Sequence, residues 1–153
     1  PLKDDLKAVC AAFGTTSAAP MLHIRGHTPE ANLPLRQGAD IHDITMADFA
    51  KCWRDFNVMT ETVDLVAIGS PHASFSECLA FANALGDRHC HSKTDTIITV
   101  GRNVLAQCAS NGVLNRLKGA GVRIFPDLCW CSITEPIFPV ACHSSEPRPT
   151  AGR

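Results

Sequence analysis

The chain has 153 residues, of which 45% are hydrophobic and 19% charged, a composition that is typical of one folded domain and excludes disordered, collagen-like and coiled-coil proteins. Its 14 Lys and Arg and 15 Asp and Glu leave a net charge of −1, so we expect no nucleic acid partner, which would require a basic surface. Its apolar runs are far shorter than the ~20 residues of a membrane span, and it opens at Pro1 without a signal peptide, so we expect a fragment that does not enter a membrane.

The first 31 residues show short local patterns. Apolar residues at helical spacing, with acids in the first turn, predict a helix over residues 4–12. A hydroxyl-rich loop is expected over residues 14–20 and a strand over residues 21–25. Thr28 is expected to cap a helical turn that begins at Pro29.

A stronger helical pattern follows. Thr45 is the expected N-cap of a helix over residues 46–56. Its apolar side chains recur every three or four residues, which predicts an amphipathic helix. The apolar face consists of Phe49, Cys52, Trp53 and Phe56.

Strands and helices alternate in the second half of the chain. Continuous apolar runs predict strands over residues 64–68, 96–100 and 122–125. Helices are predicted over residues 74–85, 103–110 and 113–118. Ser74 and Glu77 have the spacing of a capping box, and Gly86 closes that helix. This order predicts an α/β fold, a parallel sheet with flanking helices and right-handed crossovers.

The residues that follow each predicted strand have the most chemical variety. In an open parallel sheet, ligands bind beyond the carboxyl ends of the strands. There the sequence places Ser70 and His72, then Arg102, then Asp127 and Cys129. These groups suit a small anionic substrate and a metal. Each also has a structural alternative: a turn for Ser70, a surface position for His72, a salt bridge at the rim for Arg102, and burial for Cys129.

The eight cysteines are even in number, yet their context does not favour disulfides. Four lie in helical patterns and are expected to be buried free thiols. These are Cys10, Cys52, Cys78 and Cys108. With no secretory signal, we expect a reducing, cytoplasmic location. The Cys129 and Cys131 pair is a weak metal motif without a second pair, and the His-Cys-His triplet at residues 89–91 is expected to be a solvated loop.

Three motifs together resemble the aconitase X family. They are Met21-Leu-His-Ile-Arg-Gly-His-Thr-Pro-Glu-Ala31, Gly69-Ser-Pro-His-Ala-Ser74 and Asp127-Leu-Cys-Trp-Cys-Ser-Ile-Thr-Glu-Pro136. The resemblance extends from about Cys10 to Pro139. We therefore expect residues 1–139 to be an aconitase X catalytic region with an incomplete aconitase-like fold, and residues 140–153 to be a divergent, disordered tail.

The resemblance implies a dehydratase that removes water from a small hydroxy acid with the help of an iron–sulfur cluster. One branch of the family acts on cis-3-hydroxy-L-proline, and the residues around Ser70 and Cys129 are more similar to that branch. The other branch acts on mevalonate 5-phosphate, as a large subunit paired with a small swivelling subunit. As the family resemblance suggests, the cluster iron acts as a Lewis acid on the leaving hydroxyl.

The resemblance also implies roles for single residues. Cys129 is the expected cluster ligand, and His72 is expected to polarise the hydroxyl or to orient the base. Ser70 stands where some relatives carry cysteine, so it either lines the pocket or marks a branch with fewer thiolates. Substrate-lining roles are implied for Thr15, Thr16, Ser17, His23, Thr28, Glu30, Ser74 and Arg102.

The chain also departs from the family pattern. The expected Thr-Thr-Ser-Arg at a strand end is Thr99-Val-Gly-Arg102 here, and the family segment beyond Pro139 is replaced. We expect the amino-terminal part of the large-subunit module, and the small swivelling subunit or a fused domain in its place, to lie outside these 153 residues. We expect a site assembled between domains to be incomplete in 153 residues. A large subunit of phosphomevalonate dehydratase and a truncated, non-catalytic paralogue remain as alternatives.

Overall fold

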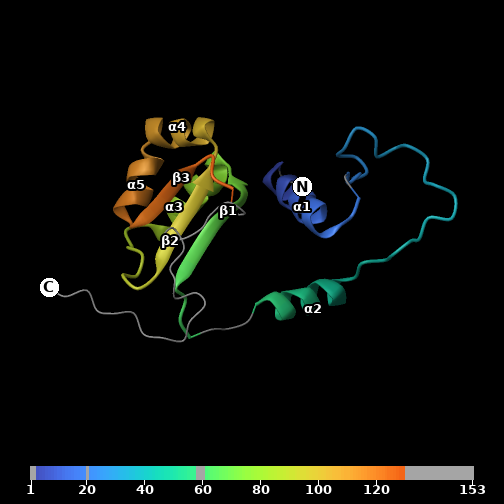
Figure 1. The fold of residues 1–153 in the computed structure, drawn as a ribbon, viewed down its shortest axis with the longest axis horizontal. Helices are drawn as coiled ribbons and strands as arrows, with labels where there is room; N and C mark the ends of the chain where they lie inside the picture. Colours follow the sequence, from blue (N-terminus) through green and yellow to red (C-terminus); the bar gives the residue numbers. More distant parts are fainter. Residues whose placement is uncertain (1–2, 20, 58–60, 130–153) are drawn as a thin grey trace. The chain divides into compact units, whose positions relative to one another are not determined.

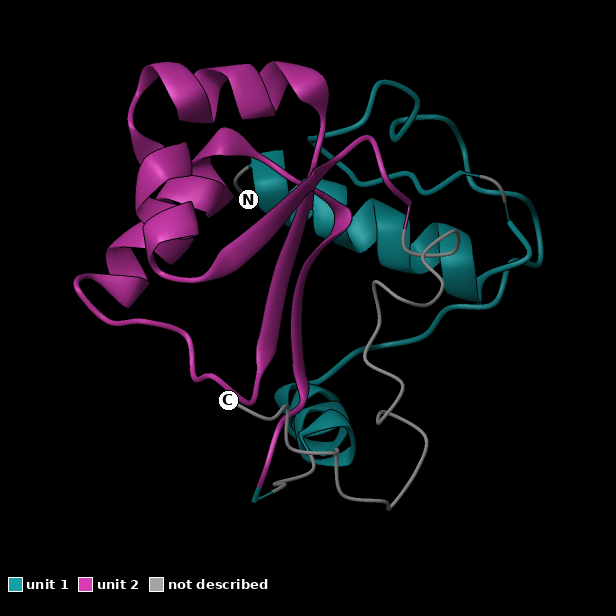
Figure 2. Cartoon of the chain, turned by 60° about the vertical axis from the view of Figure 1, so that its left-hand side comes forward, with its two compact units in different colours: residues 1–61 teal, residues 62–153 magenta. Residues whose placement is uncertain are grey.

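The chain folds as two compact units. The computed structural model describes residues 3–19, 21–57 and 61–129. Pro1–Glu61 form unit 1, and Thr62–Arg153 form unit 2 (Figure 2). The length of the chain predicted one domain. The structure instead divides into two compact units, and neither helix of unit 1 has a buried residue.

Unit 1 contains two helices, α1 (Lys3–Thr16) and α2 (Met46–Phe56). The predicted N-cap of α2 is confirmed. The Thr45 hydroxyl accepts a hydrogen bond from the Asp48 backbone amide, and the Asp48 carboxylate accepts one from the Thr45 backbone amide at 2.8 Å. This capping box satisfies two backbone donors at the first turn. The apolar face of α2 is exposed, with Trp53 at 72% and Phe56 at 86%.

Two local predictions in unit 1 are wrong. The predicted loop over residues 14–20 begins later, because α1 continues to Thr16. Residues 21–25 form no strand: the backbone amides of His27 and Thr28 both donate to the Ile24 carbonyl, which closes a turn. A strand pattern of five residues needs a neighbouring strand to pair with, and the described sheet lies entirely in unit 2.

Unit 2 is an α/β fold, as the pattern predicted. Its elements follow the chain as β1 (Leu65–Ala73), α3 (Phe75–Leu85), β2 (Asp95–Val100), α4 (Arg102–Ser110), α5 (Val113–Gly119) and β3 (Val122–Pro126) (Figure 1). The strands form a parallel sheet in the order β1-β2-β3. The predicted bounds agree to within two residues, except that β1 extends to Ala73.

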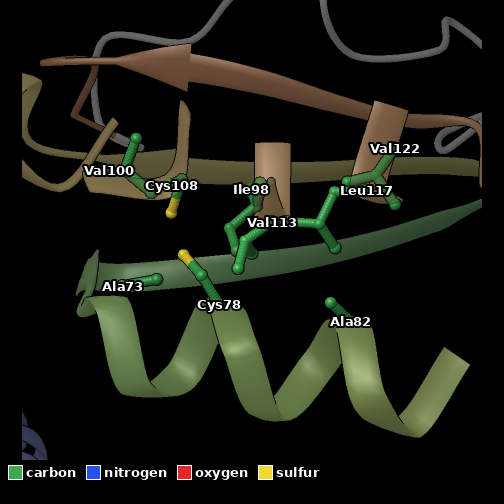
Figure 3. Close-up of a cluster of buried hydrophobic side chains, with 9 residues drawn as sticks. All are labelled: Ala73, Cys78, Ala82, Ile98, Val100, Cys108, Val113, Leu117 and Val122. Carbon is green, nitrogen blue, oxygen red and sulfur yellow. The ribbon is translucent and has the colours of Figure 1, made fainter. Parts of the chain in front are cut away.

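The core of unit 2 lies between the sheet and its helices. Ile98 and Val100 of β2 contribute to a buried cluster with side chains of α3, α4 and α5 (Figure 3). Thr99 lies between them in the sequence, so its side chain points to the other face of the sheet. Because alternate residues of β2 are buried on both faces, this central strand is rigidly held and fixes the position of the edge where it ends.

No described helix is both long enough and apolar enough to cross a bilayer. Residues 130–153, including Cys131, the predicted boundary at residue 139 and the predicted tail over residues 140–153, lie outside the described residues.

Candidate functional site

A local excursion of β1 brings two candidate residues to the carboxyl edge of the sheet. Ile68 pairs with Ile98 and Ala73 pairs with Val100. Residues 69–72 of β1 therefore lie opposite one residue of β2, Thr99, and must leave the regular ladder. This excursion carries Ser70 and His72, whose side chains are exposed. The sequence placed Ser70 and His72 after the end of the strand; the structure instead places them within β1, between the paired residues Ile68 and Ala73.

Gly69 starts the excursion with a backbone that other residues rarely adopt. Its φ is +110°, and a Cβ atom there would lie 2.4 Å from the Thr99 carbonyl oxygen. The Thr99 hydroxyl also donates a hydrogen bond of 2.6 Å to the Gly69 carbonyl. Glycine is therefore required for β1 to approach β2 this closely before it turns outward.

Arg102 and Asp127 connect the ends of β2 and β3. The Arg102 backbone amide donates to Asp127 Oδ1 at 3.1 Å, and its Nε donates to Asp127 Oδ2. The Asp127 amide donates to the Val100 carbonyl at 2.8 Å. The hydrogen bond from Arg102 lowers the pKa of Asp127, and the charges of Arg102 and His72 act in the same direction. Asp127 therefore stays ionised beside the guanidinium.

His72, which belongs to β1, contacts the same turn. Its Nε2 lies 3.0 Å from the Leu128 carbonyl oxygen. A carbonyl can only accept, so Nε2 must carry the proton of this hydrogen bond.

The structure thus places three of the predicted site residues around one turn. His72 contacts Leu128, Arg102 contacts Asp127, and Cys129 follows with an exposed thiol. Ser74 lies close by in the chain as the N-cap of α3, where its hydroxyl accepts from the Glu77 amide at 3.1 Å. The capping box at Ser74 is confirmed, while a contact of Ser74 with substrate remains a prediction.

The other predicted substrate-lining residues belong to unit 1. Thr16 and Thr15 lie in the last turn of α1, where their hydroxyls donate to the Ala12 carbonyl at 2.8 Å and 3.0 Å. The Ser17 hydroxyl accepts from a nearby backbone amide. The substrate-lining roles of Thr15, Thr16 and Ser17 remain predictions.

The second group of unit 1 residues lies around the turn at Ile24. Thr28 does not cap a helical turn through its side chain, because its hydroxyl accepts from the Ile24 amide at 2.8 Å. His23 and Glu30 are exposed on either side of this turn. The predicted roles of His23, Thr28 and Glu30 in the pocket therefore remain predictions.

The sequence placed Asp127 among the polar residues at this edge but gave it no individual role. Its φ is +53°, a conformation that Asp and Asn tolerate better than other residues with a side chain. An aspartate directly after an apolar strand was the available signal. Its pairing with Arg102, 25 residues earlier in the chain, could not be read from that signal.

The cysteines divide into buried and exposed groups. Cys78 and Cys108 are buried, as predicted. Cys10 and Cys52 are exposed, which corrects the prediction of burial, because α1 and α2 have no buried residues. Cys90, in the triplet at residues 89–91, is half-buried in the loop before β2, and its amide donates to the Ala120 carbonyl.

The described residues do not form a cluster site by themselves. Over the described part of the chain, no group of three or more His, Cys, Asp or Glu is arranged to hold a metal ion. Iron–sulfur clusters are held by several cysteine thiolates. Among the described residues, Cys129 is the single exposed cysteine at this edge of the sheet. Any further ligands must come from elsewhere.

Comparison with known proteins agrees with the division into units. The family model for the second domain of aconitase X matches residues 1–54, and the model for its third domain matches residues 63–145. The matched ranges fall on unit 1 and unit 2.

Characterised relatives and a solved structure extend this likeness. The chain is 39% identical to a cis-3-hydroxy-L-proline dehydratase of Pseudomonas aeruginosa, covering 91% of this chain and 25% of that protein. Its identity is 35% to the same enzyme of Hypocrea jecorina, with 91% and 24% covered. A phosphomevalonate dehydratase large subunit of Aeropyrum pernix is 30% identical, with 81% and 30% covered.

The solved structure is that of Thermococcus kodakaraensis aconitase X in its holo-form. It superposes with a TM-score of 0.72 at 27% identity and covers 84% of this chain and 33% of that one. This likeness confirms the predicted aconitase-like α/β fold. The chain spans about a quarter of the length of the cis-3-hydroxy-L-proline dehydratases that it resembles.

Proposed function

Because the chain belongs to the aconitase X family, we propose that it carries the part of a hydro-lyase site that binds the carboxylate and the leaving hydroxyl of a small hydroxy acid. The observation that carries the proposal is the convergence of His72 and Arg102 on residues 127–129 at the carboxyl edge of the sheet. The proposed substrate is cis-3-hydroxy-L-proline. Its support is the higher identity to dehydratases of that substrate than to the phosphomevalonate dehydratase subunit.

The side chains at the edge suit the two ends of such a substrate. Elimination of water breaks one carbon–hydrogen bond and one carbon–oxygen bond, forms a double bond and releases the proton and the hydroxide as water. Arg102 would bind the carboxylate through charge-assisted hydrogen bonds. His72 would hold or move a proton, and the contact of its Nε2 with the Leu128 carbonyl would orient the ring. Ser70 would contact the substrate from the same excursion.

An iron–sulfur cluster in the complete enzyme is part of this proposal. Cys129 is the ligand that the described residues would contribute, and the other ligands would come from outside them. A small swivelling subunit or a fused domain would close the site. The expected location is cytoplasmic.

The cluster ligand can be tested by anaerobic reconstitution of the whole chain with iron and sulfide. We expect visible charge-transfer absorption that is lost in Cys129→Ala. Cys52→Ala is the matched control, because Cys52 is also an exposed thiol but lies in α2. A colourless, metal-free chain would contradict the cluster assignment.

The dehydratase activity can be tested in a chimera. In the Pseudomonas aeruginosa relative, the aligned 145 residues are replaced by this chain. We expect the chimera to dehydrate cis-3-hydroxy-L-proline, and we expect Arg102→Gln to lower kcat/KM about 100-fold through loss of charged hydrogen bonds. Lys118→Gln, an exposed cation on α5, is the control.

The outcomes of this experiment separate the competing functions. A folded but inert chimera, beside an active parent, would favour the non-catalytic paralogue. Activity on mevalonate 5-phosphate, obtained in the corresponding chimera with the Aeropyrum pernix subunit and absent in the first chimera, would favour the phosphomevalonate branch.

A further inference from the structure

We propose that Asp127 is a positioning residue that orients the Arg102 guanidinium toward the substrate carboxylate. This inference rests on the proposed function, in which Arg102 binds that carboxylate. It gives a specific role to Asp127, which the sequence placed at this edge only as one of several polar residues.

The contacts of Asp127 are made to both the backbone and the side chain of Arg102. Oδ1 accepts from the Arg102 amide at 3.1 Å, and Oδ2 accepts from its Nε. The first contact ties the carboxylate to the first residue of α4, and the second ties the guanidinium to the carboxylate. One side chain therefore links the direction of the guanidinium to the backbone of the helix that carries it.

Occupation of Nε determines which edge of the guanidinium remains for a ligand. A guanidinium has five N–H donors, one on Nε and four on its two Nη atoms. Carboxylates bind such a fork through two parallel hydrogen bonds. With Nε donating to Asp127, the edge formed by the two Nη atoms is the one that can present two parallel donors to a substrate carboxylate.

The position of Asp127 is itself held from three directions. Its amide donates to the Val100 carbonyl at 2.8 Å, its left-handed φ of +53° turns the chain after β3, and the next carbonyl, that of Leu128, accepts from His72. The backbone that carries the carboxylate is thus bound to β1 and β2 as well as following β3. A group held on rigid strands can orient a side chain more accurately than a free loop can.

Orientation matters here because the Arg102 side chain is 83% exposed. A long exposed side chain samples many rotamers, and binding a ligand must then restrict them. The pair with Asp127 restricts the guanidinium before substrate arrives, which is preorganisation. The cost is electrostatic, because the carboxylate cancels the positive charge that would attract an anionic substrate.

These two effects act on different kinetic constants. Removing the carboxylate leaves a more positive edge, so KM should not rise. The loss of orientation should lower kcat roughly tenfold or more. A carboxylate that merely balanced charge would leave kcat unchanged.

Asp127→Asn is the principal variant, because Asn has the same shape and tolerates a left-handed φ. Asp127→Gly is the second variant, since glycine keeps that backbone and removes the side chain. In the whole chain, NMR of Arg102 should show an Nε–H proton that is shifted downfield and exchanges slowly with water. That signature should disappear in both variants and persist in Lys118→Gln.

Kinetics in the chimera complete the test. An active chimera in which Asp127→Asn lowers kcat without raising KM supports the inference. The inference is overturned, and the proposed function stands, if the chimera is active and neither variant lowers kcat. It is also overturned if the unsubstituted chain shows no slowly exchanging Nε–H proton of Arg102. An inert chimera that keeps the Arg102 signal contradicts the proposed function, and the inference falls with it.

Discussion

Replacement of Gly69 by alanine tests the close approach of β1 to β2 at the edge that carries His72. The added Cβ would lie 2.4 Å from the Thr99 carbonyl oxygen and 2.6 Å from its hydroxyl, which is about 0.9 Å inside the shortest usual C···O contact between strands, ~3.3 Å. Thr99 is fully buried and cannot retreat freely.

The expected cost follows from two effects. A φ of +110° in a residue with a side chain costs on the order of 1–3 kcal/mol. The hydrogen bond from Thr99 to the Gly69 carbonyl contributes about 1 kcal/mol and would be lost if the strands separate. We therefore expect Gly69→Ala to lower the free energy of unfolding by about 3 kcal/mol.

Urea denaturation followed by circular dichroism measures this change. For a slope of about 2 kcal/mol/M, the midpoint should fall by about 1.5 M. The matched control is Gly119→Ala, because a Cβ at Gly119 in α5 meets nothing within 4 Å. Alanine there should leave the midpoint unchanged or raise it. A Gly69→Ala midpoint equal to that of the parent chain would refute the close approach.

Three further predictions concern helix caps and thiols. Ser74→Ala removes the hydroxyl of the α3 capping box and should lower the free energy of unfolding by about 1 kcal/mol, measured by the same urea assay, and an unchanged midpoint would count against the box. Cys78 and Cys108 are at most 2% exposed, so peptide mass spectrometry should find them unlabelled by a thiol reagent until the chain is denatured, and labelling of either in the native chain would contradict their burial. A side-chain hydrogen bond from Thr45 lowers the pKa of Asp48 from 3.8, so the stabilisation is complete above the unfolded pKa and is lost as the pH falls through the lower folded one. NMR shifts of the α2 amides should therefore stay constant from neutral pH to about pH 5 and change only below about pH 4, and Thr45→Val should return the Asp48 titration toward 3.8.

Local signals predicted the elements whose physical causes are local. The caps at Thr45 and Ser74 follow from a hydroxyl and an acid three residues apart, which interact within one helical turn. The apolar runs that form β2 and β3 can be recognised because strands buried in a parallel sheet are apolar along their whole length.

Predictions that depend on a neighbouring strand or on a surface packed against a helix were less successful. Residues 21–25 have the pattern of a strand, yet a strand exists only where another strand supplies hydrogen bonds, and none does so among the described residues. Cys10 and Cys52 lie on apolar helix faces, but whether such a face is buried depends on what packs against it. The extent of β1 beyond Ile68 depends in the same way on its register with β2.

The amino-acid sequence by itself determined the order of strands and helices in unit 2 and the caps of its helices. It also determined which polar residues follow the strands, and such residues meet at one edge of a parallel sheet. Only the tertiary structure decided that Asp127 pairs with Arg102, that the Leu128 carbonyl holds His72 at Nε2, and that β1 leaves its ladder at Gly69. The physical reason is distance along the chain: caps and apolar runs act within one turn or one strand, whereas these contacts join residues that come together only when the sheet has formed.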